Sequence, residues 1–210
     1  MITNASYFIG DIYLAQVGEN ASSQVNNNDK LQSFIDKYEA NILIKALGRK
    51  LYNEFKSNLN ADGTIKDEAD SKWSNLLNGT EYVKNGTTYY WKGLVTDNEC
   101  LMAYYIYYKY VNASVTQQTT LGTIKAEAKN ASSASAIPNT VDAWRCLYDW
   151  YIGGNVYNPI VYTHNGVYVE DWFSGDNSKE VSLYQFLSDN KDNYDDWFFT
   201  PIANKNTWGL

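Results

Sequence analysis

The residues that could carry out catalysis are few and scattered. His164 is the only histidine, and it directly precedes Asn165-Gly166, a pair that favours a tight turn, so a polar turn residue is the ordinary interpretation. A catalytic triad would need this one imidazole beside a nucleophile. Cys100 and Cys146 lie far apart, and with a single histidine they do not make the clustered ligand set of a zinc site. We therefore expect two buried free thiols, no metal site and no cofactor.

Three pairs of adjacent carboxylates are the remaining candidates for chemistry. Asp67-Glu68 lies in a charged stretch, where solvation is the ordinary interpretation. Glu170-Asp171 and Asp195-Asp196 directly precede Trp172 and Trp197. A glycoside hydrolase would use two such carboxylates about 5 to 10 Å apart across a cleft lined by aromatic rings. Acids beside aromatics are also common at hairpin ends and termini, so hydrolysis is one alternative rather than the expectation.

The chain is rich in aromatic residues, with 19 Tyr and 7 Trp among 210 residues. Planar aromatic rings stack on sugar faces, so a carbohydrate-binding module is a second alternative. Such modules are mostly β-sandwiches with strands at regular spacing, whereas long stretches of this chain have helical periodicity. Tyrosine also suits surfaces that are buried only when another protein docks, because it combines an apolar ring with a hydroxyl group.

The composition limits the classes of function. Hydrophobic residues make up 44% of the chain, which is enough for a folded core. The net charge of −7 argues against non-specific DNA binding or anionic-membrane binding as the main role, since both need a basic surface. The first residues lack the basic and apolar regions of a signal peptide, and no apolar run is long enough to span a bilayer. We expect a soluble protein made in a reducing compartment.

The periodicity predicts a mainly α fold. Helical spacing covers 29–59, with Asp29 as the cap and a break at Gly48, because glycine costs roughly 1 kcal/mol inside a helix. The segments 98–117 and 140–152 are also helical, and two shorter helices are expected near 73–77 and 182–188. Two β-hairpins are expected near 80–92 and 160–170, each around an Asn-Gly turn. The fold class is thus a small helical bundle with long polar loops and two short hairpins. We expect one domain over 1–210, made of an N-terminal extended arm (1–28), a helical core (29–155) and a C-terminal extension (156–210).

The stretch "CLMAYYIYYKYV" (100–111) contains five tyrosines. Thr96 and Glu99 have the spacing of a capping box, which predicts a helix that starts just before Cys100. Apolar residues cover more than one stripe of this helix, which predicts contacts on two sides. In a small domain we expect the second side to face another chain.

The order of several motifs resembles a known family. The run "LQSFIDKYEANILIKALGRKLYNEFK" (31–56) carries Leu47-Gly48 followed by Leu51-Tyr52. After it come "WKGL" (91–94), a tyrosine-rich helix ending in "YYKYV", "TTLGTIKAEAKNAS" (119–132) and the C-terminal "PIANKNTWGL". In this order the chain resembles head–tail connector (adaptor) proteins of tailed phages of Bacteroidetes, including the crAss-like group. The hairpin at 160–170 and the aromatic residues near it depart from that pattern.

The resemblance implies a structural role in the virion. A connector subunit assembles into a closed ring, usually of about twelve copies, below the portal. The implied partners are other copies of the chain, the portal protein, other tail or ring proteins and, through transient non-specific contact, the genomic DNA that passes the lumen. No enzymatic activity, cofactor or membrane is implied. The implied location is the portal vertex or tail of the virion, after synthesis in the host cytoplasm.

The interface residues follow from the expected helix and loops. Tyr104 and Tyr108 are predicted to face the core, while Tyr107 and Tyr110 are predicted to point toward a neighbouring subunit. Residues 119–136 are predicted to be a loop that becomes ordered only in the ring, against a neighbour or the lumen. Lys125 or Lys129 of this loop would make any contact with DNA. The candidate subunit-interface residues are Tyr107, Tyr110, Thr120, Thr123, Lys125, Asn130 and Trp208.

Overall fold

The structure, a computed structural model, describes residues 1–14, 24–114, 117–119, 122–124, 137–153 and 179–202. Within these ranges the fold is mainly α with short strands, as the sequence predicts. The helices are α1 (Gln24–Leu47), α2 (Arg49–Ser57), α3 (Ser71–Asn78), α4 (Leu101–Ser114), α5 (Ile137–Tyr151) and α7 (Leu183–Asp189), with 3-10 turns η1 (Ala5–Tyr7), η2 (Gly10–Ile12) and η3 (Lys191–Asn193). The strands are β1 (Thr80–Lys84), β2 (Thr87–Trp91), β3 (Val95–Thr96), β4 (Glu99–Cys100), β5 (Gln117–Thr119), β6 (Gly122–Ile124) and β7 (Lys179–Glu180).

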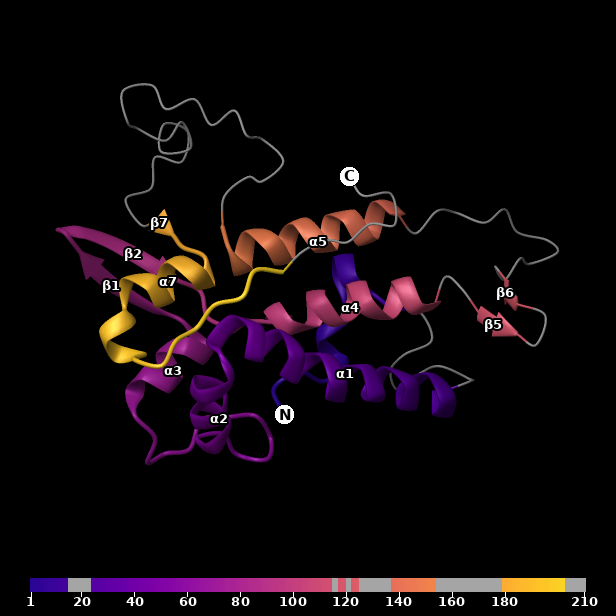
Figure 1. Cartoon of the computed structure of the whole chain (residues 1–210), viewed down its shortest axis with the longest axis horizontal. Coiled ribbons are helices and arrows are strands. Elements are labelled where there is room, and N and C mark those ends of the chain that lie inside the picture. The colour runs from indigo at the N-terminus through magenta and orange to yellow at the C-terminus, as the bar shows by residue number, and fades with distance from the viewer. Residues whose placement is uncertain (15–23, 115–116, 120–121, 125–136, 154–178, 203–210) are drawn as a thin grey trace, which may run out of the picture.

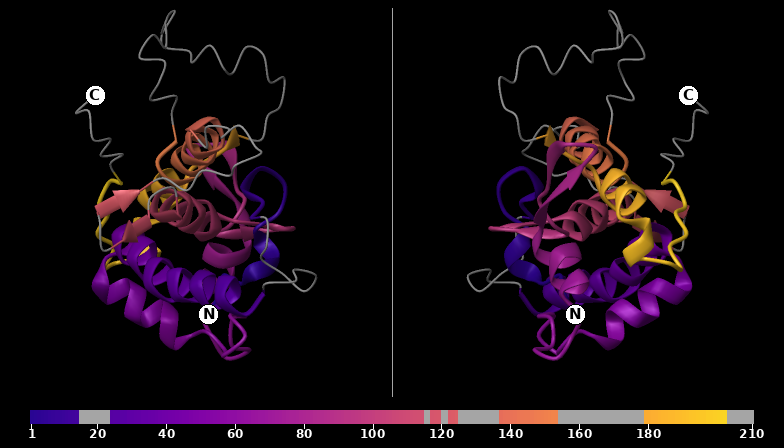
Figure 2. Two further views of the ribbon diagram at one scale, coloured as in Figure 1. Left: turned by 90° about the vertical axis from the view of Figure 1, so that its right-hand side faces the viewer. Right: turned by 90° about the vertical axis from the view of Figure 1, so that its left-hand side faces the viewer.

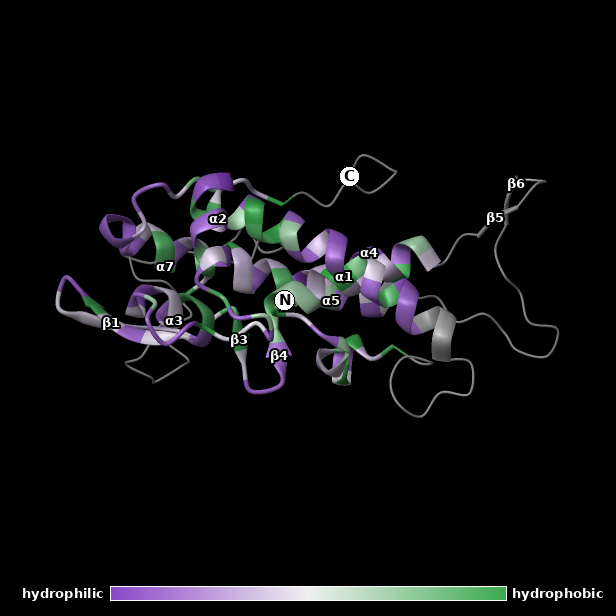
Figure 3. Cartoon of the chain, turned by 90° about the horizontal axis from the view of Figure 1, so that it is seen from below, coloured by the Kyte–Doolittle hydropathy of each residue, from purple (hydrophilic) through white to green (hydrophobic). Residues whose placement is uncertain are grey.

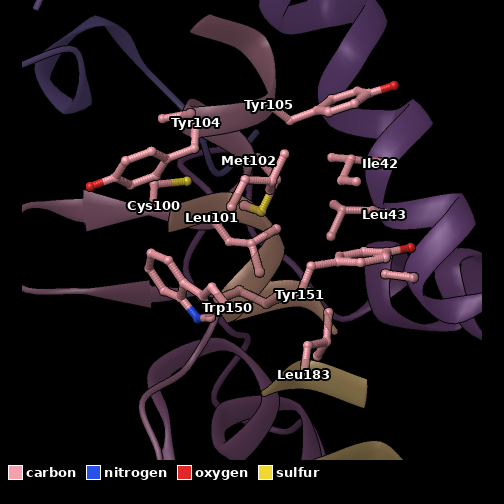
Figure 4. Packing of buried hydrophobic residues seen from close by; sticks show 14 of the residues in the cluster. Ile42, Leu43, Cys100, Leu101, Met102, Tyr104, Tyr105, Trp150, Tyr151 and Leu183 are labelled. Carbon is pink, nitrogen blue, oxygen red and sulfur yellow. The ribbon is translucent and has the colours of Figure 1, made fainter. Parts of the chain in front are cut away.

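Three long helices form the centre of the molecule. Figure 1 shows α5, α4 and α1 side by side, with α4 in the middle, and α4 contacts both neighbours. In Figure 4, Leu101 and Met102 of α4 lie between Ile42 and Leu43 of α1 on one side and Trp150 and Tyr151 of α5 on the other. The predicted burial of α4 on two sides is confirmed. The chain's own α1 and α5 cover those two sides, so the prediction that the second side needs another chain is wrong.

Helix α1 begins earlier than the sequence predicts. It starts at Gln24, so Asp29 lies inside the helix rather than at its cap. A helix that has nucleated gains one hydrogen bond for each added residue and can extend beyond its apolar stripe. The predicted break at Gly48 is confirmed, because α1 ends at Leu47 and α2 starts at Arg49, with Gly48 at a φ of 80°.

The N-terminal residues are not an extended arm. They form the turns η1 and η2 and bury the side chains of Phe8, Ile12 and Leu14 against the helices. The backbone amides of Ile2 and Thr3 donate to the buried carboxylate of Glu39 in α1, over 3.3 and 2.6 Å. The apolar residues of this segment therefore complete the core instead of forming an extended arm.

The hairpin predicted near 80–92 is confirmed. Strands β1 and β2 pair antiparallel around Asn85 and Gly86, whose φ values of 53° and 79° suit this tight turn. β7 adds to β2 in parallel. Helix α7 packs on this sheet, where the rings of Trp91 and Phe186 stack with centroids 5.4 Å apart. The second predicted hairpin, at 160–170, lies outside the described residues.

The predicted capping box is wrong. Thr96 and Glu99 pair with each other as β3 and β4 of a tight hairpin, with Asp97 at a positive φ of 44°. Helix α4 follows directly at Leu101, whose amide donates to the carbonyl oxygen of Leu94. The spacing of a capping box also fits a hairpin with a two-residue turn. Packing against the core determines which of the two structures forms.

The predicted loop at 119–136 is partly wrong as well, since β5 and β6 pair across its start. Residues 125–136 lie outside the described residues.

Candidate subunit interface

The two tyrosines predicted to meet a neighbour are buried in the single chain. Tyr107 is 4% exposed and Tyr110 is 9% exposed. The ring of Tyr110 packs edge-on against Phe34 of α1, with centroids 5.3 Å apart. Tyr108, predicted to be a core residue, is half-buried beside Trp144 of α5. The predicted outward orientation of Tyr107 and Tyr110 is wrong, because α1 and α5 approach α4 from both sides.

Most of the other predicted interface residues are not among the described residues. Thr123 lies in β6, where its backbone pairs with Gln118. Thr120, Lys125, Asn130 and Trp208 lie outside the described residues. In the described part of the chain, no two of the predicted interface residues lie together on an exposed surface.

An exposed aromatic surface is instead formed by the segment after η3 together with Tyr184 of α7. The rings of Trp197, Phe199 and Tyr184 contact one another, with centroids 4.9 to 6.1 Å apart. Phe198, between two of them in the sequence, is 70% exposed, and Tyr184 is 42% exposed. Exposed apolar side chains that lie together are typical of binding surfaces.

This segment is held by the end of α1. The last carbonyl oxygens of an α-helix have no partner within the helix. Here the indole nitrogen of Trp197 donates to Ala46 (2.8 Å), the amide of Phe198 to Leu47 (3.1 Å) and the amide of Thr200 to Lys45 (2.7 Å). The aromatic side chains are therefore presented from a backbone that is fixed at several points.

Gly48 makes this close approach possible. A Cβ atom at position 48 would lie 2.9 Å from Cβ of Phe198 and 3.1 Å from its carbonyl oxygen. The positive φ of Gly48 also favours glycine there. The glycine that separates α1 from α2 therefore also leaves room for the backbone of Phe198.

Charged residues of both signs lie beside the exposed aromatic side chains, and the carboxylates of Asp196, Glu54 and Asp195 raise the pKa of Lys50. Lys50 is 71% exposed in its side chain and pairs with Asp196 over 2.6 Å. Arg49 is exposed next to it, and Lys45 lies at the end of α1. The pKa of Lys109 in α4 is lowered by burial and, to a smaller extent, by repulsion from Lys45. We call Tyr184, Trp197, Phe198, Phe199, Lys45, Arg49 and Lys50 the C-terminal face.

A second exposed surface surrounds η2 and carries several carboxylates. Ile9 is 47% exposed and Tyr13 is 62% exposed. The pKa of the Cys146 thiol is raised by partial burial and then by the nearby carboxylates of Asp11, Asp149 and Glu99. Those acids therefore converge on one part of the surface. We call Ile9, Asp11, Tyr13, Glu99, Cys146 and Asp149 the N-terminal face.

The two faces lie on opposite sides of the helical core. Figure 2 shows the N-terminal turns on one side and the C-terminal segment that follows α7 on the other. Figure 3 shows the same arrangement from below, with β3 and β4 on one side and α2 on the other. Cys146, expected to be buried, is exposed on the N-terminal face, whereas Cys100 is buried as predicted.

A cleft of about 440 Å³ adjoins the N-terminal face and shares Glu99, Cys146 and Asp149 with it. Its wall includes Trp150, which is only 4% exposed and has the ammonium group of Lys92 3.9 Å from its ring centre. Lys92 also pairs with Glu180 at 3.5 Å. This indole therefore offers no free face for stacking on a sugar.

The chemistry considered from the sequence does not converge in the described residues. Asp67 and Glu68 are exposed, and Asp196 is paired with Lys50. His164 and Glu170-Asp171 lie outside the described residues. No group of three metal-ligating side chains occurs in the described parts of the chain. Nor does any helix there have the length and apolarity needed to cross a membrane.

No model of a known protein family, no characterised protein sequence and no solved structure matches this chain. The proposed function therefore rests on the fold, the two faces and the order of the sequence motifs.

Sequence reasoning missed Phe198, which is the most exposed aromatic residue in the described part of the chain. Phe198 lies in "DDWFFTP" (195–201), a short irregular run with neither helical nor strand periodicity. The available signal was the run of three aromatic residues directly after two acids and before a proline. Periodicity identifies core faces and carries no information about such a segment.

Proposed function

We propose that this chain is a structural subunit of a virion ring, one that joins the portal vertex to the tail and leaves a channel for DNA. The observation that supports this most directly is the pair of exposed faces on opposite sides of the core. Head-to-tail contacts in a ring are heterologous, so every subunit must offer two different surfaces. The aromatic C-terminal face and the carboxylate-bearing N-terminal face are two such different surfaces.

The internal packing also supports a structural role. The tyrosine-rich α4 is enclosed by α1 and α5, so the three helices form a packed core. The exposed aromatic residues lie at the surface of this core. Net charge −7 suits a protein that DNA passes without being held. The resemblance of the motif order to phage connector proteins agrees with this role and with partners such as the portal protein.

The experiment is to locate the chain in virions. A tagged copy expressed in infected host cells should be recovered in purified virions together with the portal protein. Reconstruction of the portal vertex should then show a ring whose subunit fits α1, α4 and α5. Exclusion of the chain from virions that package and infect normally would contradict the proposal.

A further inference from the structure

The sheet formed by β1, β2 and β7 ends in an open strand edge. β2 lies in the middle of this sheet, with β1 paired on one side and β7 on the other. Within the described residues, no strand pairs with the outer side of β1. Figure 3 shows β1 at one end of the molecule, where the tip of the hairpin extends beyond α3 and α7.

The strand register identifies the backbone groups that face outward from this edge. In an antiparallel pair, opposed residues alternate between those that exchange hydrogen bonds and those that do not. Tyr90 lies opposite Glu81, and its carbonyl oxygen accepts from the amide of Val181 (2.9 Å) on the β7 side. Tyr90 and Glu81 are therefore a pair without mutual hydrogen bonds, and so are Thr88 and Val83. The N–H and C=O groups of Glu81 and Val83 thus point away from β2.

These outward groups are available to a ligand. The carbonyl oxygen of Glu81 accepts from the hydroxyl of Thr80 (3.1 Å), and the outward groups make no other hydrogen bond among the described residues. Val83 is 68% exposed, and the side chain of Glu81 is exposed as well. Alternating free N–H and C=O groups on a strand edge are complementary to one kind of ligand, another extended backbone.

We infer that the β1 edge, meaning the outward backbone groups of Glu81 and Val83, binds an extended peptide segment of another protein. The segment adds to the sheet as a further strand, antiparallel to β1. In this mode of recognition the main-chain hydrogen bonds provide affinity and the alternating side chains provide specificity. The inference goes beyond the proposed function and does not depend on ring assembly.

The side chains along β1 define the chemistry of the bound segment. Glu81 and Val83 lie on one face of the strand, and Tyr82 between them lies on the other. On that other face the carboxylate of Asp189 already pairs with Lys84 and accepts from the hydroxyl of Tyr82, so no charge is left unmatched there. A peptide residue opposite Val83 is favoured if apolar, and one opposite Glu81 is favoured if basic. Read along the peptide, the motif is an apolar residue, any residue, then Lys or Arg.

The β1 strand of a second copy does not provide this motif. In an antiparallel pair of β1 strands, a register centred on Tyr82 puts Glu81 opposite Val83. A register centred on Val83 puts Glu81 opposite Asn85 of the turn. A register centred on Glu81 brings two carboxylates together, which is destabilising. Because none of these registers gives Glu81 a basic partner, the occupant is a segment of a different protein.

Amide hydrogen exchange followed by NMR tests the backbone pairing. In the free protein the amides of Tyr82 and Lys84, which bond to β2, should exchange slowly, and those of Glu81 and Val83 should exchange quickly. The probe is a synthetic peptide of sequence TITKT with blocked ends. At a concentration about tenfold above its dissociation constant, it should slow exchange at Glu81 and Val83 by about tenfold. The same peptide N-methylated at its isoleucine and lysine cannot donate to β1 and should give no protection.

Variants of β1 test the backbone and side-chain contributions separately, with affinities measured by fluorescence anisotropy of labelled peptides. Val83→Pro removes an outward N–H that takes no part in pairing with β2, so the hairpin should be retained and binding should weaken by at least about fivefold. Glu81→Lys should weaken binding of TITKT by about twofold to fivefold and strengthen binding of TITET by a similar factor. Glu68→Lys, at an exposed acid outside the sheet, makes the same change in charge and should leave both affinities unchanged.

The outcomes decide between the occupants. Protection of Glu81 and Val83 by TITKT alone, with the charge preference reversed in Glu81→Lys, would support the site. Absence of protection at peptide concentrations up to about 1 mM would overturn it. Protection of the two amides that grows with protein concentration in the absence of peptide would show that two copies pair here, which would overturn the assigned occupant.

Ring assembly is measured separately, by the mass of the particles. A chain that binds TITKT as described but never assembles would contradict the ring function and leave the β1 edge as a binding site. A chain that assembles into rings without binding TITKT would contradict the β1 edge alone.

Discussion

Asp189 anchors the β1–β2 hairpin to α7 through one carboxylate. Its side chain is 3% exposed, and it accepts hydrogen bonds from the hydroxyl of Tyr82 at 2.7 Å and the amide of Gln185 at 2.8 Å. Lys84 completes the set as an ion pair. Burial alone would raise the pKa of Asp189, but the hydrogen bonds from Lys84, Gln185 and Tyr82 outweigh it and lower that pKa.

Replacing Asp189 should therefore weaken the fold measurably. Asp189→Ala removes the acceptor of Tyr82 and leaves Lys84 without its partner, so we expect a loss of about 2 to 3 kcal/mol in the free energy of unfolding; Lys84 is partly exposed, which keeps the loss below that of a fully buried pair. Urea denaturation followed by circular dichroism measures it. Asp196→Ala, which breaks an exposed ion pair, is the matched control and should cause no measurable loss. Equal stability of both variants would show that the anchor is unimportant.

The same residue predicts a pH dependence. Because the pKa of Asp189 is lower in the folded state, its stabilisation is present above the unfolded-state pKa of about 4 and is lost as the pH falls through the folded-state value. The wild type should lose more unfolding free energy between pH 5 and pH 3 (chosen conditions) than Asp189→Ala does. Parallel curves for the two proteins would contradict the lowered pKa.

The two cysteines should differ in reactivity. Cys100 is 0% exposed, and burial raises the pKa of its thiol to about 11. Cys146 is exposed, with a thiol pKa raised by partial burial and by nearby carboxylates. A thiol reagent should modify one cysteine per native chain, slowly at neutral pH and faster as the pH rises, and two per chain in denaturant. Modification of both thiols at the same rate in the native protein would contradict the buried position of Cys100.

Among the elements, the break between α1 and α2 is the most informative. Gly48→Ala should destabilise the fold by about 2 kcal/mol or more, because the new Cβ atom meets the backbone of Phe198 and alanine is strained at a positive φ. Gly86→Ala is the control: its φ is 79°, and nothing lies within 4 Å of the new Cβ atom. The difference in unfolding free energy between the two variants measures the contact with the C-terminal segment. Equal losses would show that this contact adds nothing to the backbone strain.

Local signals predicted some elements and not others. The Asn85-Gly86 turn and the Gly48 break were predictable because each depends on the conformational freedom of one or two residues. Thr96 and Glu99 fit either a capping box or a tight hairpin, and only packing distinguishes the two. The orientation of Tyr107 and Tyr110 depends on where α1 and α5 lie, which a helical wheel does not contain. Phe198 was missed because its segment has no periodicity.

At the scale of the whole molecule, the net charge determines whether we expect the protein to bind DNA. Net charge −7 in each copy gives on the order of −80 for about twelve copies, and such a particle repels a duplex. The assembled protein should therefore show no measurable duplex binding in a gel-shift at about 150 mM salt, where phosphate contacts are largely screened.

Sub-micromolar duplex binding under those conditions would contradict this expectation. If such binding were lost in Lys50→Glu and retained in Asp11→Lys, the C-terminal face would be the DNA-binding surface. That result would also count against its use between subunits, since one face cannot serve both purposes in a closed ring.

The mass and shape of the purified protein test the central claim, assembly into a closed ring, most directly. A ring of about twelve 23.9 kDa chains has a mass of about 290 kDa, and electron microscopy of such particles should show closed rings with a central opening. Mass photometry and imaging should be carried out on the chain alone and in the presence of portal protein. The account predicts one discrete ring-sized species in at least the second sample. A single-chain mass in both samples, or open aggregates of indefinite size, would contradict it.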